Sequence, residues 1–349
     1  MNELAALHTQ DSGAGPVRLA WQARMIRPLS DKGVGTPASF VARSFALEKV
    51  GGSEVLHISA LGLYRAFING RRVGNDLLTP GWTAYDKRLS YQSYAVGDLL
   101  TPGENRIEIW LADGWLRSQM MWGEVPIYNT WGKDIAAIAE LCAAPGADTA
   151  LLVTDASWES GELPIRKSGI YFGEIYDARL APRVTDGTAV LDFDLSTLLP
   201  HETTPVRELE PLSPVGRWTD AEGRVVYDFG QNAGGNVALT VRGAAGARVV
   251  VEHGEVLDKD GQFYNGNYRT AAARIEYVLA GEGEEHYRPY FTFQGYRYVR
   301  VTIEGEAALL DIVSVPISSV TEARAGFSSG NALVDRLVVT GHPSSPGYN

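Results

Sequence analysis

Apolar and polar positions alternate along several segments of this 349-residue chain. Isoleucine or leucine occupies every second position from 107 to 111, and the same period recurs at residues 237–241, 275–279 and 299–303. A period of two gives a strand one buried face and one wet face, which is typical of antiparallel sheets. Asn-Gly and Asp-Gly pairs between such segments predict tight turns. The pattern therefore predicts an all-β protein of antiparallel, jelly-roll-like β-sandwiches.

Helix is expected only in short pieces. The chain contains 38 glycines and 17 prolines, and its longest stretch without either spans residues 82–96. This density of helix breakers excludes helical bundles, barrels and solenoids. Near the end, Leu333, Val334, Leu337 and Val338 repeat at helical spacing after Asn331, a suitable N-cap residue. A short C-terminal helix is therefore expected, and its apolar stripe would need a partner surface.

The chain is long enough for two domains that each bury a core. Four prolines and little periodicity mark a boundary within residues 200–218. The predicted units are a flexible tail at 1–17, a first β-sandwich at 18–204, a second at 205–320, and a linker with its helix at 321–349.

Composition narrows the choice of partners. The formal net charge is −11, and no basic stripe occurs, which disfavours nucleic acid and anionic membranes. Cys142 is the single cysteine, so neither an internal disulfide nor a cysteine-based metal site can form within the chain. The sequence shows no secretory signal at its start and no apolar run long enough to span a bilayer. We expect a cytoplasmic protein whose net charge is compatible with a neutral ligand such as a sugar.

The usual catalytic motifs are missing. The six histidines are scattered, and no nucleophile elbow, P-loop or dinucleotide fingerprint occurs. The glycine-rich segment 230–235 is interpreted as a tight turn between strands. Glu174 and Asp177 resemble a carboxylate pair for glycoside hydrolysis, but positions three apart on a strand face opposite ways. A structural role is therefore expected for both, with Arg179 pairing with one of them.

The best material for a ligand site lies within residues 110–131, which contain four tryptophans and several polar side chains. A sugar needs an aromatic face beside hydrogen-bonding groups, so Trp115, Trp122 and Asn129 are the candidate sugar-binding residues. The alternative is that the tryptophans fill the sandwich core. Asn75 and Asp76 could hold calcium through oxygen ligands, and the alternative is an ordinary turn.

Several long motifs, in order, resemble bacterial α-L-rhamnosidases. The N-terminal accessory domain of that family is matched by AFINGRRVGNDLLTPGWTAY at 66–85, by ADGW at 112–115 and by GEIYDAR at 173–179. Its second β-domain is matched by YDFGQNAGGN at 227–236 and PYFTFQGYRY at 289–298, and the following linker by residues 327–337. The resemblance runs from about residue 18 to residue 338.

The resemblance implies a multidomain glycosidase that removes terminal α-L-rhamnose by inversion. Its catalytic carboxylates belong to a large helical barrel that follows these β-domains. Because the sequence ends at Asn349, we expect the non-catalytic portion of such an enzyme, with a separate catalytic chain as one conceivable partner. A truncation, a frameshift or a split gene would each explain this ending. Two alternatives are an active α-L-rhamnosidase and a decayed structural fragment without a ligand.

Some relatives in the resembled family bind rhamnose through calcium on the first domain. The resemblance therefore suggests Asn75, Asp76 and Asn129 as calcium ligands beside a rhamnose-containing carbohydrate. No cofactor is required by the resemblance, so calcium is an optional component of this hypothesis.

Overall fold

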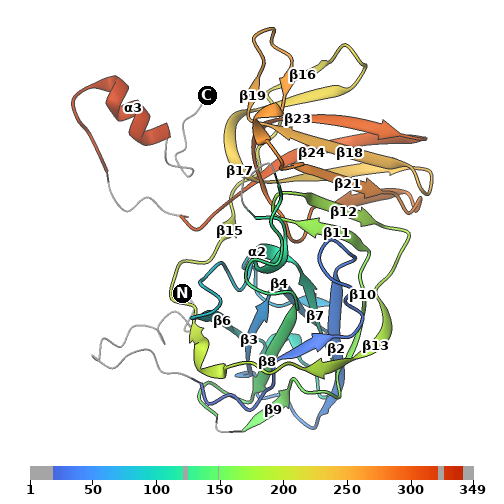
Figure 1. The fold of residues 1–349 in the computed structure, drawn as a ribbon, viewed down its shortest axis with the longest axis vertical. Helices are drawn as coiled ribbons and strands as arrows, with labels where there is room; N and C mark the ends of the chain where they lie inside the picture. The colour runs from blue at the N-terminus through green and yellow to red at the C-terminus, as the bar shows by residue number, and fades with distance from the viewer. Residues whose placement is uncertain (1–18, 121–124, 148, 321–325, 341–349) are drawn as a thin grey trace.

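The computed structural model describes residues 19–120, 125–147, 149–320 and 326–340. They form two β-rich bodies, one above the other in Figure 1, with one helix standing apart at the C-terminal end. The all-β fold class predicted from the alternating pattern is confirmed. The predicted tail at 1–17 lies outside the described residues.

Twelve strands of the described residues form the first sheet, which follows the order β14-β6-β3-β8-β1-β13-β10-β2-β7-β4-β5, with β9 added to β8. These are β1 (Ile26–Pro28), β2 (Ser39–Leu47), β3 (Val55–Leu61), β4 (Leu63–Ile68), β5 (Arg71–Arg72), β6 (Leu89–Ala95), β7 (Gly103–Ala112), β8 (Ala136–Cys142), β9 (Ala150–Val153), β10 (Glu159–Glu162), β13 (Arg183–Val190) and β14 (Leu198–Pro200).

The first sheet curls over so that its two halves share one core. Ile58 on β3 and Ile138 on β8 belong to the same buried cluster as Val41 on β2 and Ile109 on β7. These strand pairs are well separated in the order of the sheet, so a flat sheet could not bring their side chains together. The result is a sandwich of the jelly-roll type, with the alternating residues of 107–111 buried as expected.

Ten strands of the described residues form the second sheet, in the order β11-β12-β21-β18-β23-β17-β24-β15, with β16 and β22 also paired to β17. These are β11 (Ile165–Gly169), β12 (Gly173–Asp177), β15 (Arg207–Glu208), β16 (Gly216–Thr219), β17 (Val225–Gly243), β18 (Arg248–Gly254), β21 (Arg274–Val278), β22 (Glu284–Tyr287), β23 (Gln294–Glu304) and β24 (Ala307–Ser318). A small hairpin of β19 (Val256–Leu257) and β20 (Phe263–Tyr264) lies beside them.

The hairpin β11–β12 belongs to the second sheet, although its sequence lies within the predicted first domain. Strand β12 pairs in parallel with β21, and in Figure 1 the hairpin runs along the border between the two bodies. Gly173 allows this close approach, because a Cβ at this position would lie 1.7 Å from the carbonyl oxygen of Arg274. This pair and the pair β14–β6 are parallel, whereas the prediction had antiparallel strands throughout.

The prediction of a tight turn at residues 230–235 is wrong. This segment lies inside the single strand β17, where the pairing register shifts between Asp228 and Ala233. Gly230 has a positive φ of 81°, and the extra residues form a bulge that the strand absorbs. A glycine-rich bulge and a glycine-rich turn require the same residue types, which explains the error.

A buried carboxylate lies where the two sheets meet. Glu174 on β12 is fully buried, and its Oε1 accepts hydrogen bonds from the Tyr290 N–H at 2.9 Å and the Tyr287 hydroxyl at 3.1 Å. Its Oε2 accepts from the Phe291 N–H at 3.0 Å. Burial raises the pKa of Glu174, while these donors lower it. The expected structural role is thus observed, and Asp177 pairs with Arg179 as expected.

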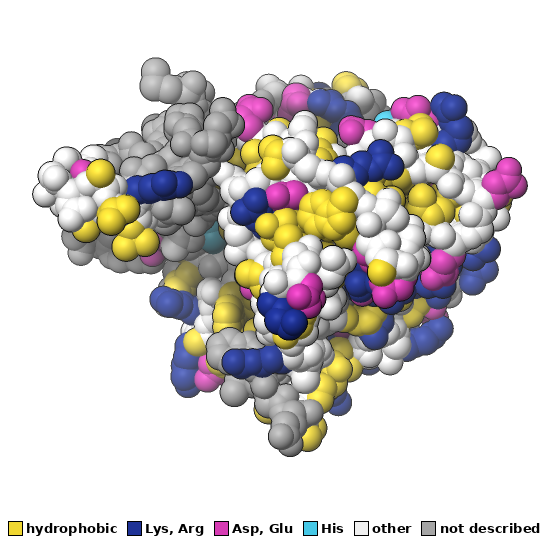
Figure 2. Space-filling model, turned by 90° about the horizontal axis from the view of Figure 1, so that it is seen from above, with side chains coloured by type: hydrophobic (Ala, Val, Ile, Leu, Met, Phe, Trp, Pro, Cys, Tyr) yellow, Lys and Arg dark blue, Asp and Glu magenta, His cyan; other side chains and the backbone are white. Residues whose placement is uncertain are grey.

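Helix α3 (Ala332–Thr340) confirms the short C-terminal helix. The Asn331 side chain accepts a hydrogen bond from the Leu333 N–H at 3.0 Å, as an N-cap residue does. The stripe is exposed, with 79% of Leu333 and 72% of Leu337 accessible, and Figure 2 shows hydrophobic side chains on this projecting segment at the left. No helix among the described residues is long and apolar enough to cross a membrane.

Glu174→Ala should lower the free energy of unfolding by about 3–5 kcal/mol, because several buried donors lose their acceptor at once. Urea unfolding followed by fluorescence measures this loss. Glu104→Ala, at an exposed position on β7, is the matched control and should change stability by less than about 0.5 kcal/mol. Equal effects of the two substitutions would contradict the proposed role of Glu174.

His253 should make stability depend on pH. Burial lowers its pKa to about 4, and Nδ1 donates to the Ala273 carbonyl at 2.6 Å. As the pH falls, the imidazole of the unfolded chain therefore takes up a proton before the imidazole of the folded chain does. The stability that uncharged His253 contributes is present above pH 6.5 and is lost as the pH falls toward 4. In urea unfolding at several pH values, the free energy of unfolding of His253→Gln should depend less on pH than that of the wild type. The difference should reach up to about 3 kcal/mol at the acid end. The exposed His286→Gln should keep the wild-type slope, and parallel curves for all three proteins would contradict this prediction.

Candidate functional site

A hollow of about 520 Å³ opens where the two β-bodies meet. We call it the junction pocket and define it by residues 76–83, 88, 90, 92, 115, 199–206, 319 and 320. One side comes from the loop before β6, a second from the connection between β14 and β15, and a third from the end of β24. Its size lies within the usual range for ligand pockets, about 300–1,000 Å³.

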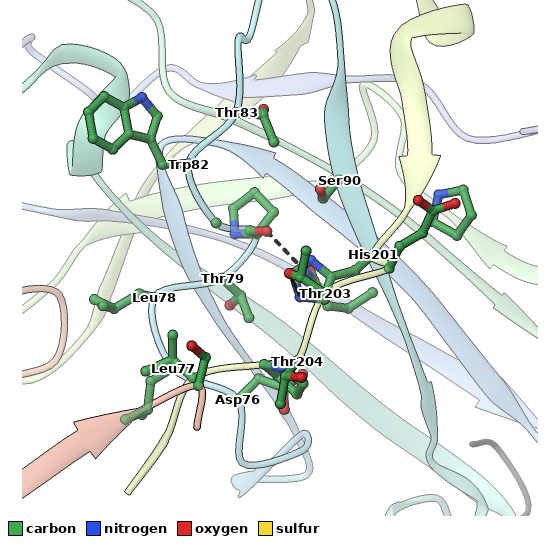
Figure 3. Close-up of a pocket in the computed structure, with 18 of the residues that line it drawn as sticks. Asp76, Leu77, Leu78, Thr79, Trp82, Thr83, Ser90, His201, Thr203 and Thr204 are labelled. Atoms are coloured by element: carbon green, nitrogen blue, oxygen red, sulfur yellow. Dashed lines mark hydrogen bonds between the residues drawn. The ribbon is translucent and has the colours of Figure 1, made fainter. Parts of the chain in front are cut away.

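Two parallel tryptophans border the junction pocket. The rings of Trp82 and Trp115 stack with an interplanar angle of 8° and centroids 6.0 Å apart, and Trp82 remains 56% exposed. Figure 3 shows Trp82 on one side, with His201 and Thr203 across from it. An exposed indole face beside polar groups is suited to the apolar face of a sugar ring.

A buried charge network holds Trp115 in place. Trp115 lies on the single-turn helix α2 (Gly114–Arg117), whose Arg117 is buried. Arg117 Nε donates to Asp113 Oδ1 at 2.6 Å, and its two terminal nitrogens each donate to Asp31 at 2.7 Å. Burial raises the pKa of the Asp113 carboxyl, and Arg117 opposes this shift. Asp113 and Arg117 thus support the fold locally, and neither lines the junction pocket.

The polar groups of the junction pocket are largely neutral. The Thr203 hydroxyl hydrogen-bonds His201 Nε2 at 3.1 Å, and burial lowers the pKa of His201, which favours its uncharged form. The Thr79 hydroxyl donates to the Tyr64 carbonyl at 2.9 Å. Ser90 and Thr204 add further hydroxyls to the lining. Such groups can exchange hydrogen bonds with sugar hydroxyls without burying a charge.

Asp76 is already neutralised by a protein cation. Its Oδ1 forms an ion pair with Arg207, and its Oδ2 accepts a hydrogen bond from the Tyr94 hydroxyl at 3.0 Å. Within the described residues, no group of three or more His, Cys, Asp or Glu side chains is placed to hold a metal ion. Arg207 thus already places a positive charge beside Asp76, and calcium binding by Asn75, Asp76 and Asn129 stays a prediction.

The structure brings some of the predicted site residues together and leaves others outside. Trp115 and Asp76 line the junction pocket, whereas Asn75 and Asn129 are exposed and are not part of its lining. Asn129 has a φ of 57°, and its N–H donates to the Arg117 carbonyl at 3.0 Å. Trp122 lies outside the described residues.

The other tryptophans are buried to different extents, and two parts of the junction pocket were not predicted. The core interpretation for the tryptophans of 110–131 holds in part for Trp110, which is half-buried and contacts Tyr290 between β22 and β23, whereas Trp131 is exposed. Outside that segment, Trp158 is fully buried. Trp82 was missed although it belongs to the motif at 66–85. The connection 199–206 was missed as well, because no local pattern connects it with a loop 120 residues earlier.

The junction pocket lacks a free pair of carboxylates. Its described lining contains Asp76 and Glu202, and both oxygens of Asp76 already have protein partners. An inverting glycosidase needs one carboxylate free to activate water and a second that donates a proton.

Two family models match the chain. The α-L-rhamnosidase N-terminal domain matches residues 52–212, and the bacterial α-L-rhamnosidase concanavalin-like domain matches residues 219–318. The α-L-rhamnosidase of Streptomyces avermitilis is 39% identical over 71% of this chain and 25% of its own length. A second one, from Formosa agariphila, is 31% identical over 81% of this chain and 32% of its own length. The chain thus spans about a quarter to a third of these curated relatives.

Solved structures show the same architecture. An α-L-rhamnosidase from Aspergillus terreus superposes with a TM-score of 0.83 at 29% identity, over 91% of this chain and 38% of that one. The Streptomyces avermitilis enzyme, solved in complex with L-rhamnose, superposes with a TM-score of 0.76 at 32% identity, over 88% of this chain and 31% of that one. Together with the two family models, these matches show that the chain belongs to the bacterial α-L-rhamnosidase family and carries its N-terminal and concanavalin-like domains.

Proposed function

We propose that this chain is a non-catalytic portion of an α-L-rhamnosidase and that it binds a rhamnose-containing carbohydrate in the junction pocket. The observation that carries the proposal is the parallel pair Trp82 and Trp115 beside neutral hydroxyl groups. A pyranose has one apolar face and several hydroxyls, so it needs a ring to contact and uncharged hydrogen-bonding partners. The choice of rhamnose rests on the family and on the relative solved with L-rhamnose.

The chief alternative is that the chain hydrolyses rhamnosides itself. Glu174 is the carboxyl whose raised pKa would suit a general acid. It is fully buried among backbone and tyrosine donors, however, and it is not part of the junction pocket. A substrate could not reach it without opening the contact between the two sheets. In a purely structural protein, the exposed face of Trp82 would have no ligand to contact.

Isothermal titration with L-rhamnose should give a Kd of about 10⁻⁴ M, because a monosaccharide offers few atoms for contact. Trp82→Ala should weaken binding about tenfold, since it removes the exposed ring of the stacked pair. Trp218→Ala is the matched control, because Trp218 packs on Tyr298 in the second sheet. Unchanged affinity in a Trp82→Ala protein that is folded by circular dichroism would remove the pocket from consideration.

The same titration with added calcium or with EDTA should give the same affinity, because Arg207 already neutralises Asp76. A tenfold gain in affinity with calcium, abolished by Asp76→Asn, would restore Asp76 as a metal ligand.

The chain alone should release no rhamnose from a chromogenic α-L-rhamnoside. The expected rate equals that of a boiled sample, because the junction pocket lacks a free carboxylate pair. Release in proportion to protein concentration, eliminated by Glu202→Gln, would instead establish the enzyme hypothesis.

A further inference from the structure

The junction pocket is built from both β-bodies. Trp82 and Thr79 come from the loop that precedes β6 in the first sheet, whereas Ser319 and Val320 follow directly after β24 of the second sheet. Residues 199–206 also line the pocket, and they run from the end of β14 in the first sheet to the start of β15 in the second. Any ligand that fills this space therefore contacts three segments that are far apart in the sequence.

Hydrogen bonds, an ion pair and a strand pairing tie these segments together at the pocket. The Leu77 N–H donates to the Val206 carbonyl at 3.0 Å, and Asp76 pairs with Arg207. Strand β15 then pairs with β24, with Arg207 opposite Ser318. The two residues of β15 thus form a narrow strap between the loop of the first sheet and the end of the second.

The end of β24 is the open side of the pocket. Ser319 and Val320 are exposed, and Val320 retains 42% of its accessible surface while it lines the hollow. A ligand placed against Trp82 and His201 would cover part of this surface. An apolar side chain and a hydroxyl at the exit of β24 can then contribute contacts that neither body offers alone.

We propose that a neutral saccharide bound in the junction pocket contacts both β-bodies at once and thereby fixes the end of β24 to the first body. This inference rests on the proposed function, since it assigns to the same site a second consequence of binding. The bound sugar acts as a further link beside the Leu77–Val206 hydrogen bond, the Asp76–Arg207 ion pair and the β15–β24 pairing.

Hydrogen–deuterium exchange of the full chain tests the proposal, with L-rhamnose and an α-L-rhamnosyl disaccharide as probes and maltose as the control sugar. At about ten times Kd, amide exchange at residues 317–320 should slow by up to about tenfold, together with exchange at 77–83. Residues 308–311, at the other end of β24, should not change.

A pair of variants adds an independent measurement. Val320→Ala removes a contact on the second body and should weaken binding about threefold without changing the unfolding midpoint. Leu310→Ala is the matched control, because Leu310 is exposed on β24 and lies outside the pocket.

The outcomes separate the two proposals. Protection of both segments, with weaker binding by Val320→Ala, supports a site shared between the bodies. Calorimetric binding with protection confined to 77–83 would overturn the inference and leave the proposed function standing. Absence of any calorimetric binding by either probe would overturn both.

Discussion

The arrangement of this molecule depends on one buried carboxylate. Glu174 has no access to solvent, and a carboxyl group can be buried in this way only if donors surround it. Tyr287, Tyr290 and Phe291 supply those donors, and all three come from the second body. Strand β12 lies in the second sheet beside β21, and this pairing places Glu174 next to those donors. Phe40 and Leu63 of the first body share a buried cluster with Ile165 and Phe291 of the second.

Charged groups elsewhere serve the same structural purpose. Arg117 is surrounded by two aspartates beneath α2, and Arg207 pairs with Asp76 beside the junction pocket. The Asp76–Arg207 pair neutralises one charge of the pocket lining, which also contains Arg88 and Glu202 beside aromatic rings and hydroxyls.

Local patterns predicted the β-elements well, because alternation reports directly on which side of a strand is buried. The segment 107–111 became a buried face of β7 for this reason. A different argument, from glycine content, failed at residues 230–235, since a bulge and a turn make the same demand for glycine. The pairing of β12 with β21 was not predicted, because the two strands lie about a hundred residues apart in the sequence.

The sequence by itself determined the all-β class, the capped C-terminal helix and the family. Each of these depends on neighbouring residues or on a motif read in order. Only the tertiary structure decided that Trp82 stacks on Trp115, that residues 199–206 close the pocket, and that Arg207 pairs with Asp76. The physical reason is that a pocket and an ion pair require side chains to meet in space. Trp82 and Trp115 lie 33 residues apart and Asp76 and Arg207 lie 131 residues apart, so no local periodicity encodes either contact.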